Sequence, residues 1–161
     1  MRIVLALIFA LLTLQSPSSR QSNQQKPSSD FERYSEVLLA GWGDPEEHRE
    51  AVSKLAQINT PEAAWVLLRV LEHNLENKQG NTAGWECVRE GDEYVARIKP
   101  ALNVLLMDAL VQLRVADALP LFEKMRSMDL GEQETKLRLE IDLNSLRDYK
   151  RRGELRHTRK P

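Results

Sequence analysis

Cys87 is the residue best suited to covalent chemistry, and it is the single cysteine among the 161 residues. A cysteine becomes a nucleophile when a nearby base lowers the pKa of its thiol. The histidines that could act as that base are His48, His73 and His157, and no spacing in the sequence aligns any of them with the thiol. We therefore predict no catalytic residue. We interpret Cys87 as an idle or buried thiol, which could also pair with another molecule in an oxidising compartment.

Two of these histidines stand close to acidic residues in the sequence, and His and Glu side chains together can bind a metal ion. His48 follows Glu47, and His73 lies between Glu72 and Glu76. A protein metal site needs at least three converging ligands, and the sequence has no His-x-x-x-His or Cys-x-x-Cys spacing. We predict a solvated surface here, with no metal and no cofactor. A small enzyme or sensor that uses the thiol or a His–Glu pair is the alternative.

The stretch 77–92 is the most unusual segment, because it contains three glycines and interrupts a pattern of helices. We expect it to be an inserted loop on the binding face of a helical protein. An exposed Trp85 would then serve as an interface anchor. The residues predicted to bind a partner protein, in and just beyond this stretch, are Asn81, Trp85, Glu86 and Tyr94. The alternative is that Trp85 folds back onto the core and the loop only bridges two helix pairs.

Residues 150–161 form a basic tail in which arginine and lysine outnumber the acids. Such a run can contact the phosphates of anionic lipid head groups, and we predict that contact for Arg151, Arg152 and Arg156. No series of aromatic side chains accompanies the charges, so nucleic acid is not expected as a partner. The simpler alternative is a solvated tail whose charge offsets the negative end of the preceding helix.

Helices must position all these residues, because apolar side chains recur at helical spacing through most of the chain after residue 29. Asp44-Pro45 and Thr60-Pro61 each combine a capping side chain with a proline in the first turn, so each predicts a helix start. The expected helices begin at residues 31, 45 and 61 and then cover 98–115, 116–128 and 132–149. The apolar face predicted for the last one is Leu137, Ile141 and Leu146, with Leu139 and Leu143 at its margin. No strand is expected.

The segments 51–70 and 106–125 share a pattern of apolar residues at an offset of fifty-five residues. Two copies of one helix–turn–helix unit are what a stacked helical array requires. Chance similarity between two amphipathic helix pairs is the competing explanation.

The sequence at 44–55, DPEEHREAVSKL, resembles the first helix of HEAT-type repeats, in particular the short bacterial form, and PEAAWVLL at 61–68 resembles the second. Asp108-Ala109-Leu110 and the stretch 117–121 are similar to the same pair downstream. Two features depart from the family pattern. The offset exceeds the usual ~40–47 residues, and Val104 stands where Arg49 would map. The resemblance implies a curved α-solenoid fragment with a binding role and without catalytic residues.

Residues 1–18 predict an export signal or a short N-terminal membrane anchor. One positive charge precedes an apolar run at 3–12, and small polar residues follow it. The run is shorter than the ~20 residues that span a bilayer. A cut after Ser18 fits the preference for small side chains, and a buried N-terminal helix is a further alternative. Residues 19–29 predict a disordered linker of serine, glutamine and proline. The protein is therefore expected to be exported, either periplasmic or secreted.

About 130 residues remain for a folded part, which is enough for one domain. The formal net charge of −1 gives no global field that would attract a polyanion. We predict an all-α domain at 30–149, a short right-handed superhelix of five to six helices in antiparallel, HEAT-like pairs. The predicted function is that of a non-enzymatic protein–protein interaction module with an unidentified protein partner. A structural anchor at the membrane surface is the alternative.

Overall fold

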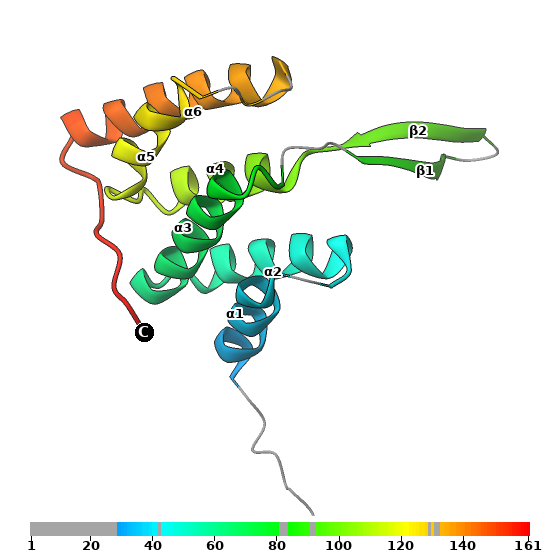
Figure 1. The fold of residues 1–161 in the computed structure, drawn as a ribbon, viewed down its shortest axis with the longest axis horizontal. Coiled ribbons are helices and arrows are strands. Elements are labelled where there is room, and N and C mark those ends of the chain that lie inside the picture. The colour runs from blue at the N-terminus through cyan, green and yellow to red at the C-terminus, as the bar shows by residue number, and fades with distance from the viewer. Residues whose placement is uncertain (1–28, 42, 81–83, 91–92, 129, 131–132) are drawn as a thin grey trace, which may run out of the picture.

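The computed structural model describes residues 29–41, 43–80, 84–90, 93–128, 130 and 133–161 (Figure 1). The predicted export signal and all but the last residue of the predicted linker lie outside the described residues. Among the residues that are described, no helix has both the length and the apolar character needed to cross a membrane.

Helices dominate the described chain, which confirms the prediction of a mainly helical fold. The helices are α1 (Asp30–Ala40), α2 (Pro45–Ile58), α3 (Pro61–Glu76), α4 (Leu102–Gln112), α5 (Ala118–Met125) and α6 (Gln133–Arg151). Two antiparallel strands, β1 (Gly84–Glu90) and β2 (Glu93–Lys99), stand between α3 and α4.

The prediction that the chain has no strand is therefore wrong. Much of the stretch predicted as a loop is β1, and the start of the helix predicted at 98–115 belongs to β2. The strands are rich in aromatic and β-branched residues, which fit an extended backbone better than a helical one. Pairing of Glu90 with Glu93 leaves two residues, Gly91 and Asp92, to join the strands, and this is the commonest length of a hairpin connection.

Local capping explains where the first three helices begin. Asp44 accepts a hydrogen bond from the backbone N–H of Glu46 at 2.9 Å, and Thr60 accepts one from Ala63 at 3.2 Å. Both caps confirm the predicted helix starts. The first helix begins at Asp30, one residue before the predicted start, because Ser29 caps it through a reciprocal pair of bonds with the third helical residue, Glu32.

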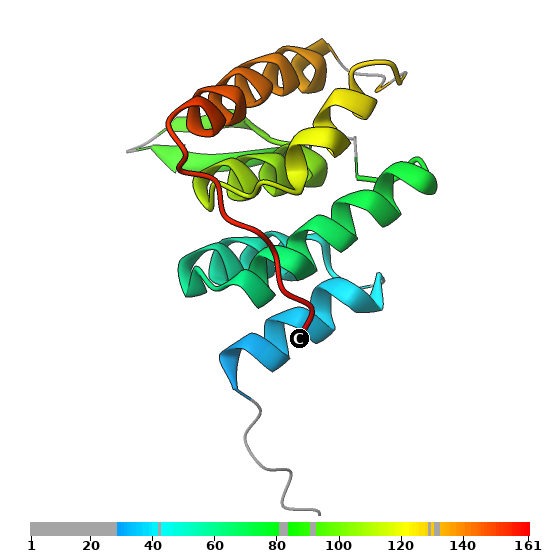
Figure 2. The ribbon, with the colours of Figure 1, turned by 90° about the vertical axis from the view of Figure 1, so that its left-hand side faces the viewer.

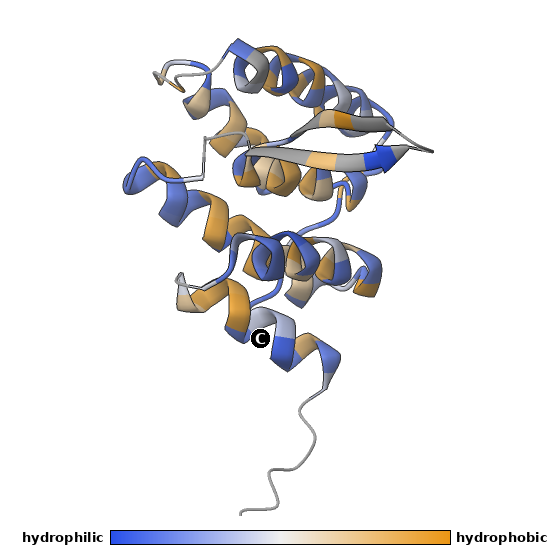
Figure 3. Cartoon of the chain, turned by 90° about the vertical axis from the view of Figure 1, so that its right-hand side faces the viewer, coloured by the Kyte–Doolittle hydropathy of each residue, from blue (hydrophilic) through white to orange (hydrophobic). Residues whose placement is uncertain are grey.

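The helices stack in successive levels from α1 to α6 (Figure 2). Helix α1 packs on α2 and α3, α2 packs on α4, and α4 packs on both α3 and α6. Figure 3 shows apolar and polar residues alternating around the helices, as expected when each helix buries one side. The largest fully buried side chains include Leu55, Leu67, Leu106, Phe122 and Leu143.

The buried face of α6 matches the predicted one only at Leu146 and at the two residues expected at its margin. Leu139, Leu143 and Leu146 are buried, whereas Leu137 is 65% exposed and Ile141 is 48% exposed. Both stripes have helical spacing, so spacing alone does not choose between them. Contact with α4 and α5 decides which stripe faces the core.

Residues 152–161, which we call the C-terminal strap, lie along the edge of the stack (Figure 2). Arg156 exchanges backbone hydrogen bonds with the α4–α5 connection, donating to Arg114 at 2.8 Å and accepting from Ala116 at 2.7 Å. Further on, the N–H of Arg159 donates to the carbonyl of Pro61 at the start of α3. The backbone of the strap is thus bonded to the helical body, while most of its residues remain exposed.

Candidate interaction site

The hairpin of β1 and β2 projects from the helical body (Figure 1). Its register is continuous, from the pair Gly84–Lys99 at the base to the pair Glu90–Glu93 at the tip. Each strand packs mainly against the other, and neither makes more than slight contact with a helix. Cys87, Arg89, Val95 and Ala96 in the middle of the hairpin are exposed, whereas Lys99 at its base is partly covered.

Three of the four residues predicted to bind a partner lie on this hairpin. Trp85 and Glu86 are on β1, paired with Ile98 and Arg97, and Tyr94 is on β2. The fourth, Asn81, lies outside the described residues. The structure thus places three of the four predicted residues on one projecting element, although that element is a hairpin rather than the predicted loop.

Cys87 is exposed on β1, opposite Ala96. The histidines have other polar neighbours. His73 lies 3.3 Å from the side-chain amide of Asn77, and His157 lies 3.0 Å from a carboxylate oxygen of Asp117. Among the described residues, no group of three or more His, Cys, Asp or Glu side chains is arranged to hold a metal ion.

Two asparagines hold the base of the hairpin. The side-chain amide nitrogen of Asn74, on α3, donates to the side-chain oxygen of Asn103 at 2.9 Å, and Asn103 Nδ2 donates to the carbonyl of Gln79 at 2.7 Å. The backbone N–H of Asn103 also donates to the carbonyl of Gly80 at 2.9 Å. Both asparagine side chains are buried, so their hydrogen bonds are protected from water. We call Asn74, Asn103 and the Gln79 carbonyl the asparagine clamp.

Gly80 is needed for this close approach of the chain. A Cβ atom at position 80 would lie 2.5 Å from Oδ1 of Asn103 and 2.9 Å from Nδ2 of Asn74. Its backbone φ angle of +74° also lies in a region that residues other than glycine rarely adopt. The glycine therefore lets the chain leave α3 directly over the asparagine clamp.

Helix α2 holds the other side of the base. The Arg49 guanidinium donates to the carbonyl of Pro100, which follows β2 directly. Glu46 forms an ion pair with Lys99 at 2.9 Å, and Arg49 lies 3.5 Å from the same carboxylate. Three helices thus fix the point from which the hairpin projects.

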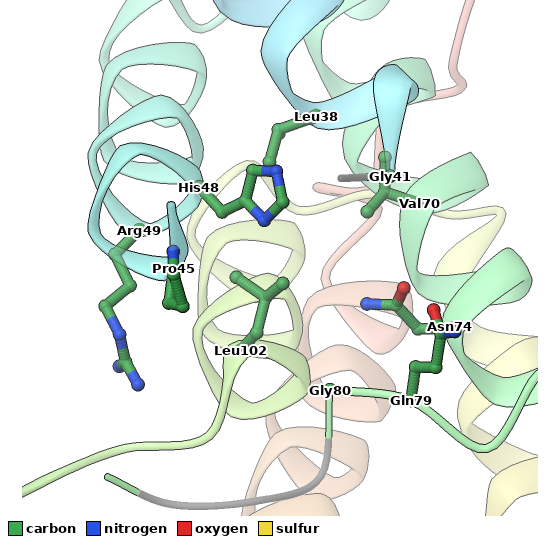
Figure 4. A pocket seen from close by; sticks show the side chains of 10 residues that line it. All are labelled: Leu38, Gly41, Pro45, His48, Arg49, Val70, Asn74, Gln79, Gly80 and Leu102. Atoms are coloured by element: carbon green, nitrogen blue, oxygen red, sulfur yellow. The ribbon is translucent and has the colours of Figure 1, made fainter. Parts of the chain in front are cut away.

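A pocket of about 250 Å³ lies between these contacts (Figure 4). Figure 4 shows His48, Leu38 and Leu102 on one side and Asn74 and Gln79 on the other. The Nε2 atom of His48 is buried and has no hydrogen-bond partner among the described residues. The pocket is small for a drug-sized ligand, since such sites usually exceed ~300 Å³. Its position makes it part of the base of the hairpin.

A buried carboxyl group that the sequence analysis missed lies between α4 and α6. Asp142 is only 2% exposed, and Arg138 bonds to Asp108 at 2.5 Å and approaches Asp142 at 3.5 Å. Burial raises the pKa of Asp142 to about 7, and the nearby charge of Asp108 adds to this effect. The available signal was an acid placed between Leu139, Leu143 and Leu146 in the apolar stripe of a helix.

The arginines predicted to contact an anionic surface lie at the end of α6 and in the C-terminal strap. Arg151 pairs with Asp148, and Arg152 lies 2.8 Å from Glu154 and over the ring of Tyr149. Arg156 is exposed and carries the backbone contacts of the strap described above. Two of the three positive charges thus have acidic partners nearby, which reduces the field that they present to a lipid surface.

The strap itself is anchored at Asp117. This carboxylate accepts hydrogen bonds from the backbone N–H of Thr158 at 2.8 Å and from its hydroxyl at 2.7 Å. Burial tends to raise the pKa of Asp117, but the bonds from Thr158 and the neighbouring His157 outweigh it and hold that pKa below its ordinary value.

Comparison with known proteins gives no match to this chain, whether with family models, curated proteins or solved structures.

Proposed function

We propose that this protein is an interaction module, in which a short HEAT-like helical array presents the β1–β2 hairpin to a partner protein. The observation that carries the proposal is the hairpin itself, which projects from the body and exposes Cys87, Arg89, Val95 and Ala96. A two-stranded hairpin is only marginally stable in water by itself. A partner that adds a strand or covers a face would supply the missing contacts.

The base of the hairpin supports the same proposal. Burying the amide groups of Asn74 and Asn103 is unfavourable unless every polar group finds a partner. The clamp satisfies these amides with bonds that join the end of α3 to the start of α4. An arrangement of this kind fixes the direction in which a binding element projects, and that lowers the entropy lost when a partner binds.

The order of the helices supports a solenoid arrangement. The repeated segments at 51–70 and 106–125 coincide with the pairs α2–α3 and α4–α5, and the hairpin stands between the two pairs. Helices α1 and α6 cover the two ends, which is the role of terminal repeats in a stacked array. We propose that the module acts outside the cytoplasm, because the first eighteen residues have the pattern of an export signal.

The test compares the tagged full-length protein with a variant in which residues 82–100 are replaced by a short Gly-Ser linker. The linker can close the gap because the Gly80 carbonyl lies 2.9 Å from the backbone nitrogen of Asn103. Both proteins are used for affinity capture from an envelope fraction, after circular dichroism has shown equal helix content. A matched control carries Arg126→Ala, which alters an exposed ion pair with Glu140 far along the chain from the hairpin.

We expect one or more proteins to be captured by the full-length chain and by the control but not by the variant without the hairpin. The same proteins captured by all three would show that the hairpin is not the binding element.

A further inference from the structure

The outer edge of β2 is long and regular. Seven consecutive register pairs join β1 and β2 without a bulge, and β2 contains no proline. Natural proteins usually protect such an edge with a bulge, a proline, a covering element or charged side chains, because a free edge recruits another strand. Strand β2 carries charged residues at Glu93, Arg97 and Lys99, but it has no bulge and no proline. Val95 is 36% exposed and Ala96 is exposed, so the middle of β2 is also open to solvent.

We infer that the edge of β2 pairs with the same edge of a second copy of this chain, antiparallel and about a two-fold axis at Ala96. The inference rests on the proposed function, because it identifies the partner that the hairpin binds. Each copy would contribute two strands, and the dimer would contain one four-stranded sheet in the order β1-β2-β2-β1. Such an interface is isologous and therefore closes without forming a filament.

The backbone of β2 presents the groups that this pairing needs. In an antiparallel ladder, successive residues direct their N–H and C=O groups alternately towards and away from the neighbouring strand. Counted from the closing pair Glu90–Glu93 of the two-residue connection, positions 94, 96 and 98 direct theirs away from β1. A two-fold axis at Ala96 places position 96 opposite itself and position 94 opposite 98, so the outward groups of one copy meet those of the other.

Two of the cross-copy pairs in this register are complementary, whereas Arg97 stands opposite Val95. Tyr94 stands opposite Ile98 of the second copy, which is a favourable aromatic–aliphatic pair. Glu93 stands opposite Lys99, so opposite charges meet at both ends of the new ladder. Lys99 already pairs with Glu46, whose side chain is 57% exposed, so both carboxylates would surround one ammonium group.

Strand β1 lacks this complementarity. Antiparallel pairing of β1 with itself about Cys87 would place Glu90 opposite Gly84 and Glu86 opposite Val88. No pair of opposite charges would form, whereas pairing of β2 with itself places Glu93 opposite Lys99. The sequence therefore favours the β2 edge over the β1 edge.

Disulfide trapping tests the proposed register in the full chain. The trap is Ala96→Cys in a Cys87→Ser background, because residues opposite each other in a hydrogen-bonded pair have Cα atoms roughly 5.5 Å apart. A disulfide spans that separation. The matched control is Val95→Cys in the same background, since self-pairs displaced by two residues lie roughly 7–8 Å apart. We expect mild oxidation to give a covalent dimer with the trap and at least tenfold less with the control.

The unmodified chain provides a further internal comparison. In the proposed sheet, the two Cys87 residues are separated by three strand spacings, or about 14 Å. They should therefore remain reduced under conditions that link position 96. Efficient linkage through Cys87 with none through position 96 would overturn the inference and assign the dimer to the β1 edge.

Sedimentation velocity provides a measurement without cysteine chemistry. The wild-type chain should show a concentration-dependent dimer, and Ala96→Pro should remove it. Proline at this outward position deletes an edge donor and leaves the bonds between β1 and β2 in place. A monomer at every concentration, with hairpin-dependent capture of a different protein retained, would refute self-pairing but not the proposed function. Loss of both would refute the two proposals together.

Discussion

Replacing Asn103 by alanine is the most direct test of how the hairpin is held. The side chain of Asn103 is fully buried, and among the described residues it bonds with Asn74 and with the carbonyl of Gln79. Alanine removes both bonds and keeps the backbone bond to Gly80. The amide of Asn74, which is 7% exposed, then loses its partner inside the protein.

The size of the effect follows from these bonds. Each hydrogen bond contributes about 1 kcal/mol net, and leaving a buried polar group without a partner costs about 1–3 kcal/mol. We expect the free energy of unfolding to fall by about 3 kcal/mol. For a domain of this size, that corresponds to a decrease of roughly 10 °C in the melting temperature.

Urea denaturation followed by circular dichroism measures the change. Asn144→Ala, at an exposed position on α6, is the matched control and should change stability by no more than about 0.5 kcal/mol. The double variant Asn74→Ala/Asn103→Ala should cost about 1–2 kcal/mol less than the sum of the single changes, because neither side chain is left unpaired. Hydrogen exchange at β1 and β2 should also become faster in Asn103→Ala. A loss below 0.5 kcal/mol with unchanged exchange would refute the asparagine clamp.

Other predictions concern the glycine, the two acids and the faces of α6. Gly80→Ala should destabilise the protein by at least about 2 kcal/mol in urea denaturation, through strain at positive φ and a clash with the clamp; equal stability would contradict the close approach. Because the raised pKa of Asp142 keeps it protonated in the folded state up to about pH 7, whereas an unfolded aspartate ionises near 3.8, wild-type stability should fall as pH rises through this window. Asp142→Asn should remove that dependence, which amounts to at most about 4 kcal/mol in the free energy of unfolding. Parallel profiles of stability against pH for the two proteins would argue against the raised pKa. The pKa of Asp117 is lowered instead, so its contribution to stability is present above about pH 4 and is lost at lower pH. Asp117→Ala should lower the free energy of unfolding by about 1 kcal/mol at pH 7 and should speed proteolysis of the C-terminal strap. Leu143→Ala should cost about 2–5 kcal/mol and Leu137→Ala less than about 0.5 kcal/mol, and the reverse order would restore the predicted face of α6.

Local chemistry determined the parts of the fold that sequence alone predicts. A capping side chain and a proline act within one helical turn, so Asp44-Pro45 and Thr60-Pro61 located the starts of α2 and α3 without knowledge of the rest of the chain. The regular recurrence of leucine and alanine likewise predicted a mainly helical protein. The sequence also drew attention to the segment around Trp85, which lies in the projecting hairpin.

Tertiary contacts decided the other parts of the fold, because the local sequence pattern in those segments is compatible with more than one structure. Ile98 continues the helical spacing of the residues that follow it, yet it pairs with Trp85 across a hairpin, and only that pairing makes it a strand residue. Residues far apart in sequence, such as Asn74 and Asn103, form the clamp, and no local pattern predicts a bond across twenty-nine positions. The stripe of α6 that is buried and the course of the strap also depend on neighbours in space, which a pattern of spacing and charge along one segment does not contain.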